Sequence, residues 1–193
     1  METTPCIPSR TLVVGVSCAG KSTFARRLAG ISGARWIELD ELFWSERWQP
    51  KSKEEFARLV AEATAGPAWI ADGHYGRGRD VLWPQAERLI WLNYGKPRVL
   101  WRSLKRSIRR CLAREPLWHG NRETFRKTFL SMDSILLWVY TTFERRRREL
   151  TALRESGAYP NLEWIEFAHP RQAERWLRSL EQADRHKALP ETG

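Results

Sequence analysis

The sequence predicts an α/β domain with a parallel sheet of five strands between helices. Three observations support this prediction: short apolar runs alternate with longer stretches of helical periodicity, the first run leads into a glycine-rich loop, and two later runs end in an aspartate. With 193 residues, of which 42% are hydrophobic, the chain can form one domain with a sizeable core. We expect that domain to span residues 10–183, followed by a tail at 184–193.

The five apolar runs are the expected strands, at residues 11–16, 35–39, 68–71, 88–92 and 163–167. The stretches between them are the expected helices. The first two should run from 21 to 29, ending near Gly30, and from 51 to 65, where Gly66 and Pro67 stop the pattern. Three later helices are expected: one that begins at Pro97, one over about 129–150, and one from 170 to about 183.

The helix that begins at Pro97 has an apolar row and a basic row. The apolar row recurs every four residues and is expected to pack, at Leu100, Leu104, Ile108 and Leu112. The basic row falls on the other side, at Arg102, Arg106, Arg109 and Arg110. A basic row on a helix is either a solvated face or a phosphate-binding face, and a phosphate-binding loop in the same chain favours the second interpretation.

Positive charge is concentrated in one part of the chain. The formal net charge is +10, and residues 96–148 hold 15 lysines and arginines against four carboxylates. This segment therefore carries all of the excess, which suits a partner that bears phosphate groups. Three cysteines without metal-ligand spacing indicate neither a disulfide framework nor a zinc site.

The segment from Gly15 to Ser22 has the spacing Gly-x-x-x-x-Gly-Lys-Ser of a phosphate-binding loop. Such a loop follows a strand, opens a helix and wraps phosphates in backbone N–H groups. We expect Lys21 to contact the β- and γ-phosphates of a nucleotide, and the Ser22 hydroxyl to bind Mg²⁺. The predicted nucleotide-binding residues are Gly15, Ser17, Cys18, Ala19, Gly20, Lys21, Ser22 and Thr23.

Two carboxylates follow predicted strands. Asp72 ends the run "WIAD" and is expected beside the phosphate loop, where a carboxylate that orients magnesium belongs. Asp40 ends the run "IELD" and should lie on the same edge of the sheet. It could accept a proton from an acceptor hydroxyl, or it could cap the next helix.

These segments together resemble the adenylate-kinase-related family known as topology modulation proteins. The resemblance lies in the phosphate loop, "LDELFW" with Trp48 shortly after it, "WIADGHY", "LIWLNYGKPRVLWR", "LWHGNRET" and "DSILLW", and it covers roughly residues 10–180. Two positions depart from related patterns. His74 replaces the usual asparagine of this family, and Arg77 lies one residue beyond the arginine of the similar DGFPR segment of adenylate kinases.

The resemblance implies a three-layer P-loop NTPase fold with a helical, arginine-rich lid, here at about 106–150, that closes over ATP. It also implies an acceptor site between the ends of the second and third strands. We expect acceptor contacts from Asp40, Phe43, Trp44, Trp48, Asp72, His74, Tyr75 and Arg77. Lys21, Asp40 and the lid arginines are the expected catalytic residues, the arginines being Arg110, Arg114 and Arg122, with Arg106 and Arg126 as further candidates.

The sequence therefore predicts a kinase that uses ATP and Mg²⁺ to phosphorylate a small molecule, such as a nucleoside or nucleotide. A nucleic-acid-binding ATPase or regulator is the alternative, because the basic segment also suits a phosphate backbone. No apolar run approaches the ~18 residues of a membrane span and no leader is visible, so we expect a cytoplasmic protein. The sequence leaves the oligomeric state open, and the final LPETG is either a sortase tag or native.

Overall fold

Five parallel strands form the centre of the molecule, in the order β2-β3-β1-β4-β5. The computed structural model describes residues 10–73, 75–113 and 135–188. The strands are β1 (Arg10–Gly15), β2 (Arg35–Glu38), β3 (Trp69–Asp72), β4 (Arg88–Leu92) and β5 (Glu163–Phe167). The longer helices are α1 (Lys21–Ser32), α3 (Lys53–Ala63), α5 (Lys96–Ala113), α7 (Ile135–Glu155) and α8 (Pro170–Ala188). Two short helices are α2 (Leu39–Phe43) and α4 (Arg79–Leu82).

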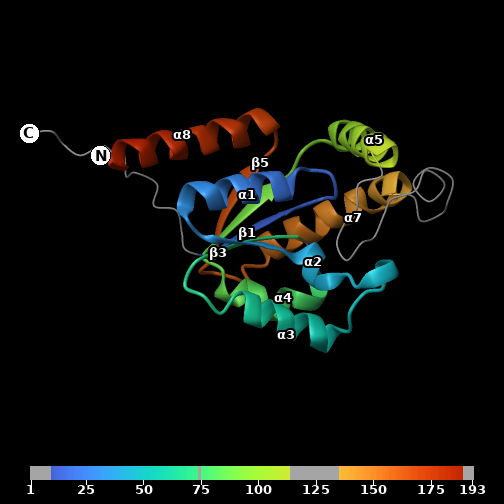
Figure 1. Ribbon diagram of the computed structural model, residues 1–193, viewed down its shortest axis with the longest axis horizontal. Coiled ribbons are helices and arrows are strands. Elements are labelled where there is room, and N and C mark those ends of the chain that lie inside the picture. The colour runs from blue at the N-terminus through green and yellow to red at the C-terminus, as the bar shows by residue number, and fades with distance from the viewer. Residues whose placement is uncertain (1–9, 74, 114–134, 189–193) are drawn as a thin grey trace, which may run out of the picture.

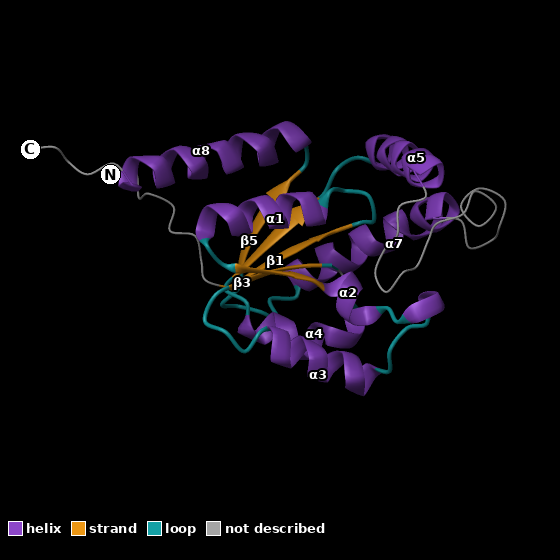
Figure 2. Cartoon of the chain, viewed as in Figure 1, coloured by secondary structure: helices purple, strands orange, loops and turns teal. Residues whose placement is uncertain are grey.

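Helices cover both faces of this sheet, so the chain has the predicted α/β architecture (Figure 1). Figure 2 shows α1 and α8 on one side of the strands, with α3 and α4 on the other. Strands β1 and β4 are buried almost throughout because side chains of both faces meet helices. Val13 and Ile90 belong to the core beneath α1 and α8, whereas Leu12 and Leu89 belong to the opposite core.

The strand order puts the phosphate loop at a point where the chain changes direction across the sheet. After β1 the chain passes over the position of β3 to form β2, and it returns through β3 before β4 and β5 are added on the other side of β1. In open parallel sheets, ligands bind beyond the carboxyl ends of the strands at such a switch point. The carboxyl ends of β1, β2 and β3 therefore define where a site should lie.

Several helix boundaries differ from their predicted positions, and capping residues explain the first two. The first helix does not end near Gly30 but continues to Ser32, because Gly33 (φ +69°) supplies the left-handed residue that closes it. The second begins at Lys53, since the Ser52 hydroxyl accepts a hydrogen bond from the Glu55 N–H. The last helix continues to Ala188, so residues 184–188 of the expected tail are helical. Of the helix expected at 129–150, residues 129–134 lie outside the described residues.

The predicted packing face of α5 is confirmed only in part, since Leu100 packs against the core but other residues of the row do not follow. Val99 and Ser103 are fully buried, whereas Ile108, expected in the packed row, is 43% exposed. The side chains of Leu100 and Leu104 are half-buried, and that of Leu112 lies outside the described residues. The helix lies beyond the carboxyl ends of the strands rather than flat on a sheet face (Figure 1), so a different row is covered.

Candidate active site

The phosphate loop has the backbone conformation that its glycines were expected to allow. Gly20 (φ +98°) is left-handed, and Cys18 (φ +65°) adopts the same region although it carries a side chain. At Gly15 a Cβ atom would lie 2.8 Å from the carbonyl oxygen of Leu92 in β4, so only glycine fits there. Among the described residues, no side chain caps the first N–H groups of α1. Free N–H groups and the helix dipole together favour an anion at this point.

Lys21 and Ser22 are the first two residues of α1, and their side chains make different hydrogen bonds. The Lys21 ammonium donates to the Val16 carbonyl at 3.2 Å and so folds back over the loop. The Ser22 hydroxyl donates to Asp72 Oδ1 at 2.8 Å. The Ser22 and Asp72 oxygens therefore meet beside the phosphate loop.

Asp72 reaches this position because β3 pairs with β1. Val13 and Asp72 are partners in the register of the two strands, and the Gly73 N–H donates to the Val13 carbonyl at 3.2 Å. The Asp72 side chain is buried, and its second oxygen accepts a hydrogen bond of 2.7 Å from Nε1 of Trp36. Burial raises the pKa of Asp72 to about 6, although the Trp36 and Ser22 donors and the Lys21 charge act in the opposite direction.

This pair of residues fits Mg²⁺. A hydroxyl and a carboxylate are hard oxygen donors, and Mg²⁺ is commonly held by one or two protein oxygens together with phosphate oxygens and water. Residues 10–73, 75–113 and 135–188 contain no cluster of three or more His, Cys, Asp or Glu side chains placed to bind a metal.

Asp40 differs from its predicted position, since it lies in the first turn of α2 rather than at a strand end. Strand β2 ends at Glu38, and the chain turns into the helix at Leu39. The Tyr75 hydroxyl donates a short hydrogen bond to Asp40 Oδ1. This contact joins the segments after β2 and β3, the two segments expected to surround the acceptor.

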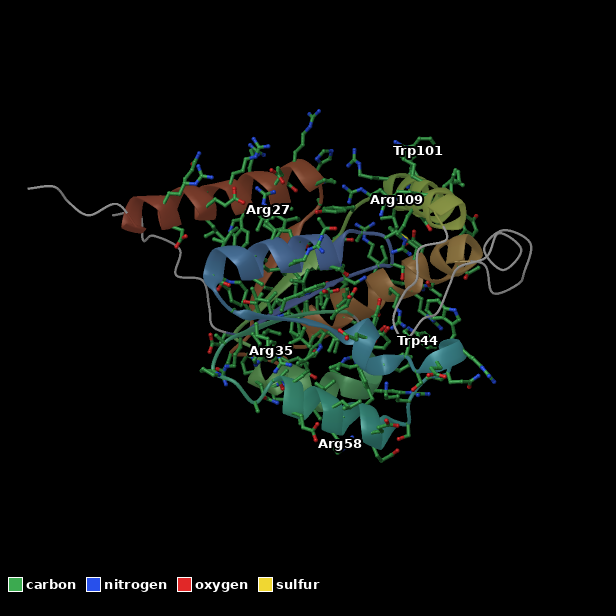
Figure 3. All side chains as sticks on the ribbon, in the orientation of Figure 1. Arg27, Arg35, Trp44, Arg58, Trp101 and Arg109 are labelled. Carbon is green, nitrogen blue, oxygen red and sulfur yellow. The ribbon has the colours of Figure 1, made fainter. Side chains whose placement is uncertain are left out.

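An aromatic cluster surrounds the Asp40–Tyr75 contact. The ring centroids of Phe43 and Tyr75 are 4.4 Å apart, and those of Trp44 and Trp48 are 5.7 Å apart. Phe43 is buried, whereas Trp44, Trp48 and Tyr75 are half-buried. Figure 3 shows Trp44 beside α2. Four of the expected acceptor residues are therefore neighbours.

Arg77 lies beside this cluster rather than within it. Its guanidinium donates to the Lys51 carbonyl at 3.1 Å and lies 5.7 Å from the centre of the Phe43 ring. His74 lies outside the described residues, as do Arg114, Arg122, Arg126 and the side chain of Arg110. Arg106 is half-buried, and its Nε is buried without a hydrogen-bond partner among the described residues.

Comparisons with known proteins give a clear result for the fold. No family model matches the sequence, and no curated protein matches it. Solved structures match over nearly the whole chain. A gluconokinase from Sinorhizobium meliloti 1021 has a TM-score of 0.50 and 18% identity, and 94% of each chain is covered. A shikimate kinase from Bacteroides thetaiotaomicron has a TM-score of 0.53 and 13% identity, with 93% of this chain and 98% of that chain covered. The chain has the fold of the P-loop kinases.

A third similar structure is a sugar kinase from Janibacter sp. HTCC2649, with a TM-score of 0.50 and 23% identity over 92% of this chain and 98% of that chain. At these identities the likeness concerns the fold, and the resemblance to topology modulation proteins stays a prediction from motifs. No helix in the described part of the chain has the length and apolar character needed to cross a membrane.

Two residues of the P-loop region were missed by the sequence analysis as site residues. Trp36 holds Asp72, as described above, but nothing in a strand sequence indicates a contact with a residue 36 positions away. Arg102 was assigned only to a basic row. Its guanidinium donates to the Ala19 carbonyl of the P-loop at 2.8 Å and lies 5.5 Å from the centre of the Tyr94 ring. The row of arginines on α5 was the available signal, and Arg102 is its member that reaches the loop.

Proposed function

We propose that the protein is a kinase that uses ATP and Mg²⁺ to phosphorylate a small molecule, for example a nucleoside or nucleotide. The observation that carries this proposal is the 2.8 Å hydrogen bond from the Ser22 hydroxyl to Asp72. This bond joins the start of α1 to the end of β3. Two hard oxygen donors therefore lie beside the P-loop, where the terminal phosphates of a nucleotide would bind. The names of the similar structures, which are kinases of gluconate, shikimate and sugar, are consistent with it.

The P-loop would bind the triphosphate of ATP through its backbone. The uncapped N–H groups at the start of α1 favour the anion, and the Lys21 ammonium has donors beyond the one given to the Val16 carbonyl. Arg102 adds positive charge at the same loop. The proposed nucleotide-binding residues are those of the sequence prediction, Gly15, Ser17, Cys18, Ala19, Gly20, Lys21, Ser22 and Thr23.

Ser22 and Asp72 would hold the metal. Bound Mg²⁺ would neutralise phosphate charge and polarise the group that is transferred. Trp36 keeps one oxygen of the Asp72 carboxylate fixed, and the burial of that carboxylate strengthens its preference for a positively charged partner.

Asp40 would accept the proton of the acceptor. Tyr75 holds one of its carboxylate oxygens, which leaves the other to take the proton from an acceptor hydroxyl. In the transfer, a bond forms between the acceptor oxygen and the γ-phosphorus of ATP, and the bond from that phosphorus to the β-phosphate oxygen breaks, so that ADP leaves. The nearby aromatic side chains and Arg77 would bind the body of the acceptor. Arg110, Arg114 and Arg122 of the expected lid would stabilise charge during transfer.

A screen of acceptors tests the proposal. ADP release is measured with ATP, Mg²⁺ and a panel of nucleosides, nucleotides and small alcohols, and one class should raise it well above background hydrolysis. In Lys21→Ala the acceptor-dependent rate should fall by on the order of 10²-fold or more, because a donor to the transferred phosphate is lost. Lys53→Ala, which removes an exposed lysine of α3, is the matched control. Full activity of Lys21→Ala would refute the kinase assignment.

One further arm of the screen separates the alternative function. For an ATPase driven by nucleic acid, single-stranded or duplex DNA should stimulate ATP hydrolysis at ~0.15 M salt. A kinase of small molecules should keep the same basal hydrolysis when DNA is added.

A further inference from the structure

Helix α5 carries far more positive charge than one nucleotide needs. Its 18 residues include seven lysines and arginines and not one carboxylate. Like charges so close together on one helix repel one another unless anions lie nearby. Arg102 points to the P-loop, where a nucleotide would meet it. The other six cations are spread from Lys96 to Arg110, over about 21 Å of the helix.

A second row of α5 is exposed to solvent. Successive residues on a helix are about 100° apart, so Trp101 points in a different direction from Arg102. Arg98, Trp101, Lys105 and Arg109 share one side of the helix at spacings of three and four residues, and all four are exposed. We call these four residues the α5 outer row. With a rise of about 1.5 Å per residue, the row is about 16 Å long.

Trp101 is the unusual member of this row, because 58% of its surface is exposed. The Lys105 ammonium lies 5.3 Å from the centre of the indole ring. In Figure 3 the Trp101 side chain extends outward from the top of α5, away from the sheet. The lysine over the ring is a favourable cation–π contact, and an exposed indole flanked by cations also suits a ligand that offers both a flat ring and negative charge.

The positive surface continues onto the start of α8. Desolvation lowers the pKa of His169, and the positive charges of Arg98 and Arg171 lower it further, so the two helix starts act on the same group. Arg171 and Arg175 are exposed on α8, one turn apart. Figure 1 shows α8 and α5 along the same side of the molecule. The α5 outer row is thus one end of a longer basic surface.

We propose that this surface binds single-stranded nucleic acid, with a base stacked on Trp101 and the backbone phosphates on the arginines and lysine beside it. Base stacking needs an exposed aromatic face, and the flanking cations match the charge of the phosphates. A duplex hides the faces of its bases, and an acidic peptide would not use the indole in this way. The proposal does not depend on phosphoryl transfer, because its test is made without ATP.

The test measures fluorescence anisotropy of a labelled oligothymidylate of about 20 nucleotides with the full chain, without ATP, from about 50 to 300 mM KCl. An abasic oligonucleotide of equal length reports the backbone alone. Trp101→Ala should weaken oligothymidylate binding by roughly 10- to 100-fold and leave the abasic affinity nearly unchanged, since stacking is lost and charge is kept. Lys105→Gln should weaken binding of both oligonucleotides and reduce the slope of log K against log salt by about 0.7.

Two matched controls test whether the effects are specific to the α5 outer row. Tyr140→Ala removes another exposed aromatic ring with a lysine over it, Lys96 at 4.0 Å, and should leave binding unchanged. Arg58→Gln removes one positive charge from α3, on the opposite side of the molecule in Figure 3, and should leave the salt slope unchanged. Thermal unfolding of each variant verifies the fold.

Three outcomes would overturn the proposal. The first is no binding of oligothymidylate at the lowest salt. The second is an equal loss of oligothymidylate and abasic binding in Trp101→Ala, which would indicate a site for any polyanion. The third is binding of vesicles with anionic lipids that depends on Trp101 while the oligothymidylate does not bind, which would indicate a membrane surface.

Discussion

Asp72 is a buried carboxylate whose neighbours are arranged for a cation. Its two oxygens accept hydrogen bonds from Ser22 and Trp36, and burial raises its pKa to about 6. The pKa of an aspartate in an unfolded chain is about 3.9. Because the folded value is higher, the protonated carboxyl contributes stability that is fully present below about pH 4 and is lost as the pH rises through about 6. Without a metal, ionised Asp72 therefore destabilises the fold at neutral pH.

Replacing Asp72 with asparagine should remove this cost. The asparagine amide can accept from Trp36 and donate to Ser22, so the two contacts are kept without the charge. With EDTA present, Asp72→Asn should exceed the wild type in free energy of unfolding by up to about 3 kcal/mol at pH 8, and the difference should vanish near pH 4. Urea unfolding between these pH values measures it. A variant that is less stable by the same amount at every pH would contradict this account.

The two aspartates of the site should respond differently to magnesium. Asp72→Asn should raise the Mg²⁺ concentration needed for activity, and excess Mg²⁺ should restore part of the rate. Asp40→Asn should lower the acceptor-dependent rate by ~10²- to 10⁴-fold while basal hydrolysis and metal dependence stay nearly the same. Rates are compared across a magnesium titration, with Asp80→Asn, an exposed carboxylate of α4, as control. Rescue of Asp40→Asn by metal would exchange the two roles.

Helices α1 and α8 are joined by one arginine, and this contact sets part of the acid sensitivity. The Arg27 guanidinium lies between the carboxylates of Glu174, at 2.6 Å, and Glu181, at 2.7 Å (labelled in Figure 3). Hydrogen bonds from Arg178 and Arg27 lower the pKa of Glu174, and one from Arg27 lowers that of Glu181. Stability from lowered carboxylate pKa values is present above the unfolded value of about 4.3 and is lost as the pH falls through the folded values.

Arg27→Met should therefore lose stability relative to the wild type at pH 6, and this loss should shrink as the pH falls, because protonation of the two carboxylates removes the ion pairs. Urea unfolding over this pH range measures the difference, which should shrink in high salt because the groups are partly exposed. Arg58→Met, which removes an ion pair within α3 alone, is the control. An effect of Arg27→Met that is independent of pH would show that its aliphatic packing matters rather than its charge.

The lid expected at about 106–150 is where nucleotide should have its largest effect. Its arginines repel one another until phosphate arrives, so ATP with Mg²⁺ should protect amides at about 110–130 from hydrogen exchange. Exchange with and without nucleotide, followed by mass spectrometry, measures this. Lys21→Ala should show a smaller change at the same nucleotide concentration. Equal protection in both states would contradict a closing lid.

Over the whole molecule, the strands were predictable and the contacts between them were not. Each of the five strands begins within one residue of its predicted position, because buried parallel strands leave apolar runs that turn residues bound. The P-loop followed from local spacing. Trp36 and Asp72, or Asp40 and Tyr75, meet only after strand order and register are set, and 35 or more residues separate each pair.

Helix α5 shows why amphipathic patterns fail at the rim of a sheet. Periodicity identified the helix and its two rows, but it assumed that the leucine row would be covered. The structure instead buries Val99 and Ser103 and brings Arg102 to the P-loop. Which row is covered depends on where the helix crosses the sheet, and this position is set by β4 and the connection after it.

The position of β1 at the middle of the strand order has an evolutionary consequence. The residues proposed to bind the acceptor lie between 40 and 77, whereas α5 and α7 follow β4, on the other side of β1. Changes in one half can thus accumulate without disturbing the other, so that descendants can acquire new acceptors while retaining ATP. Chimaeras that exchange residues 39–63 with a homologous segment should keep nucleotide affinity and change acceptor preference. The P-loop would then be the constant part of enzymes that phosphorylate different acceptors.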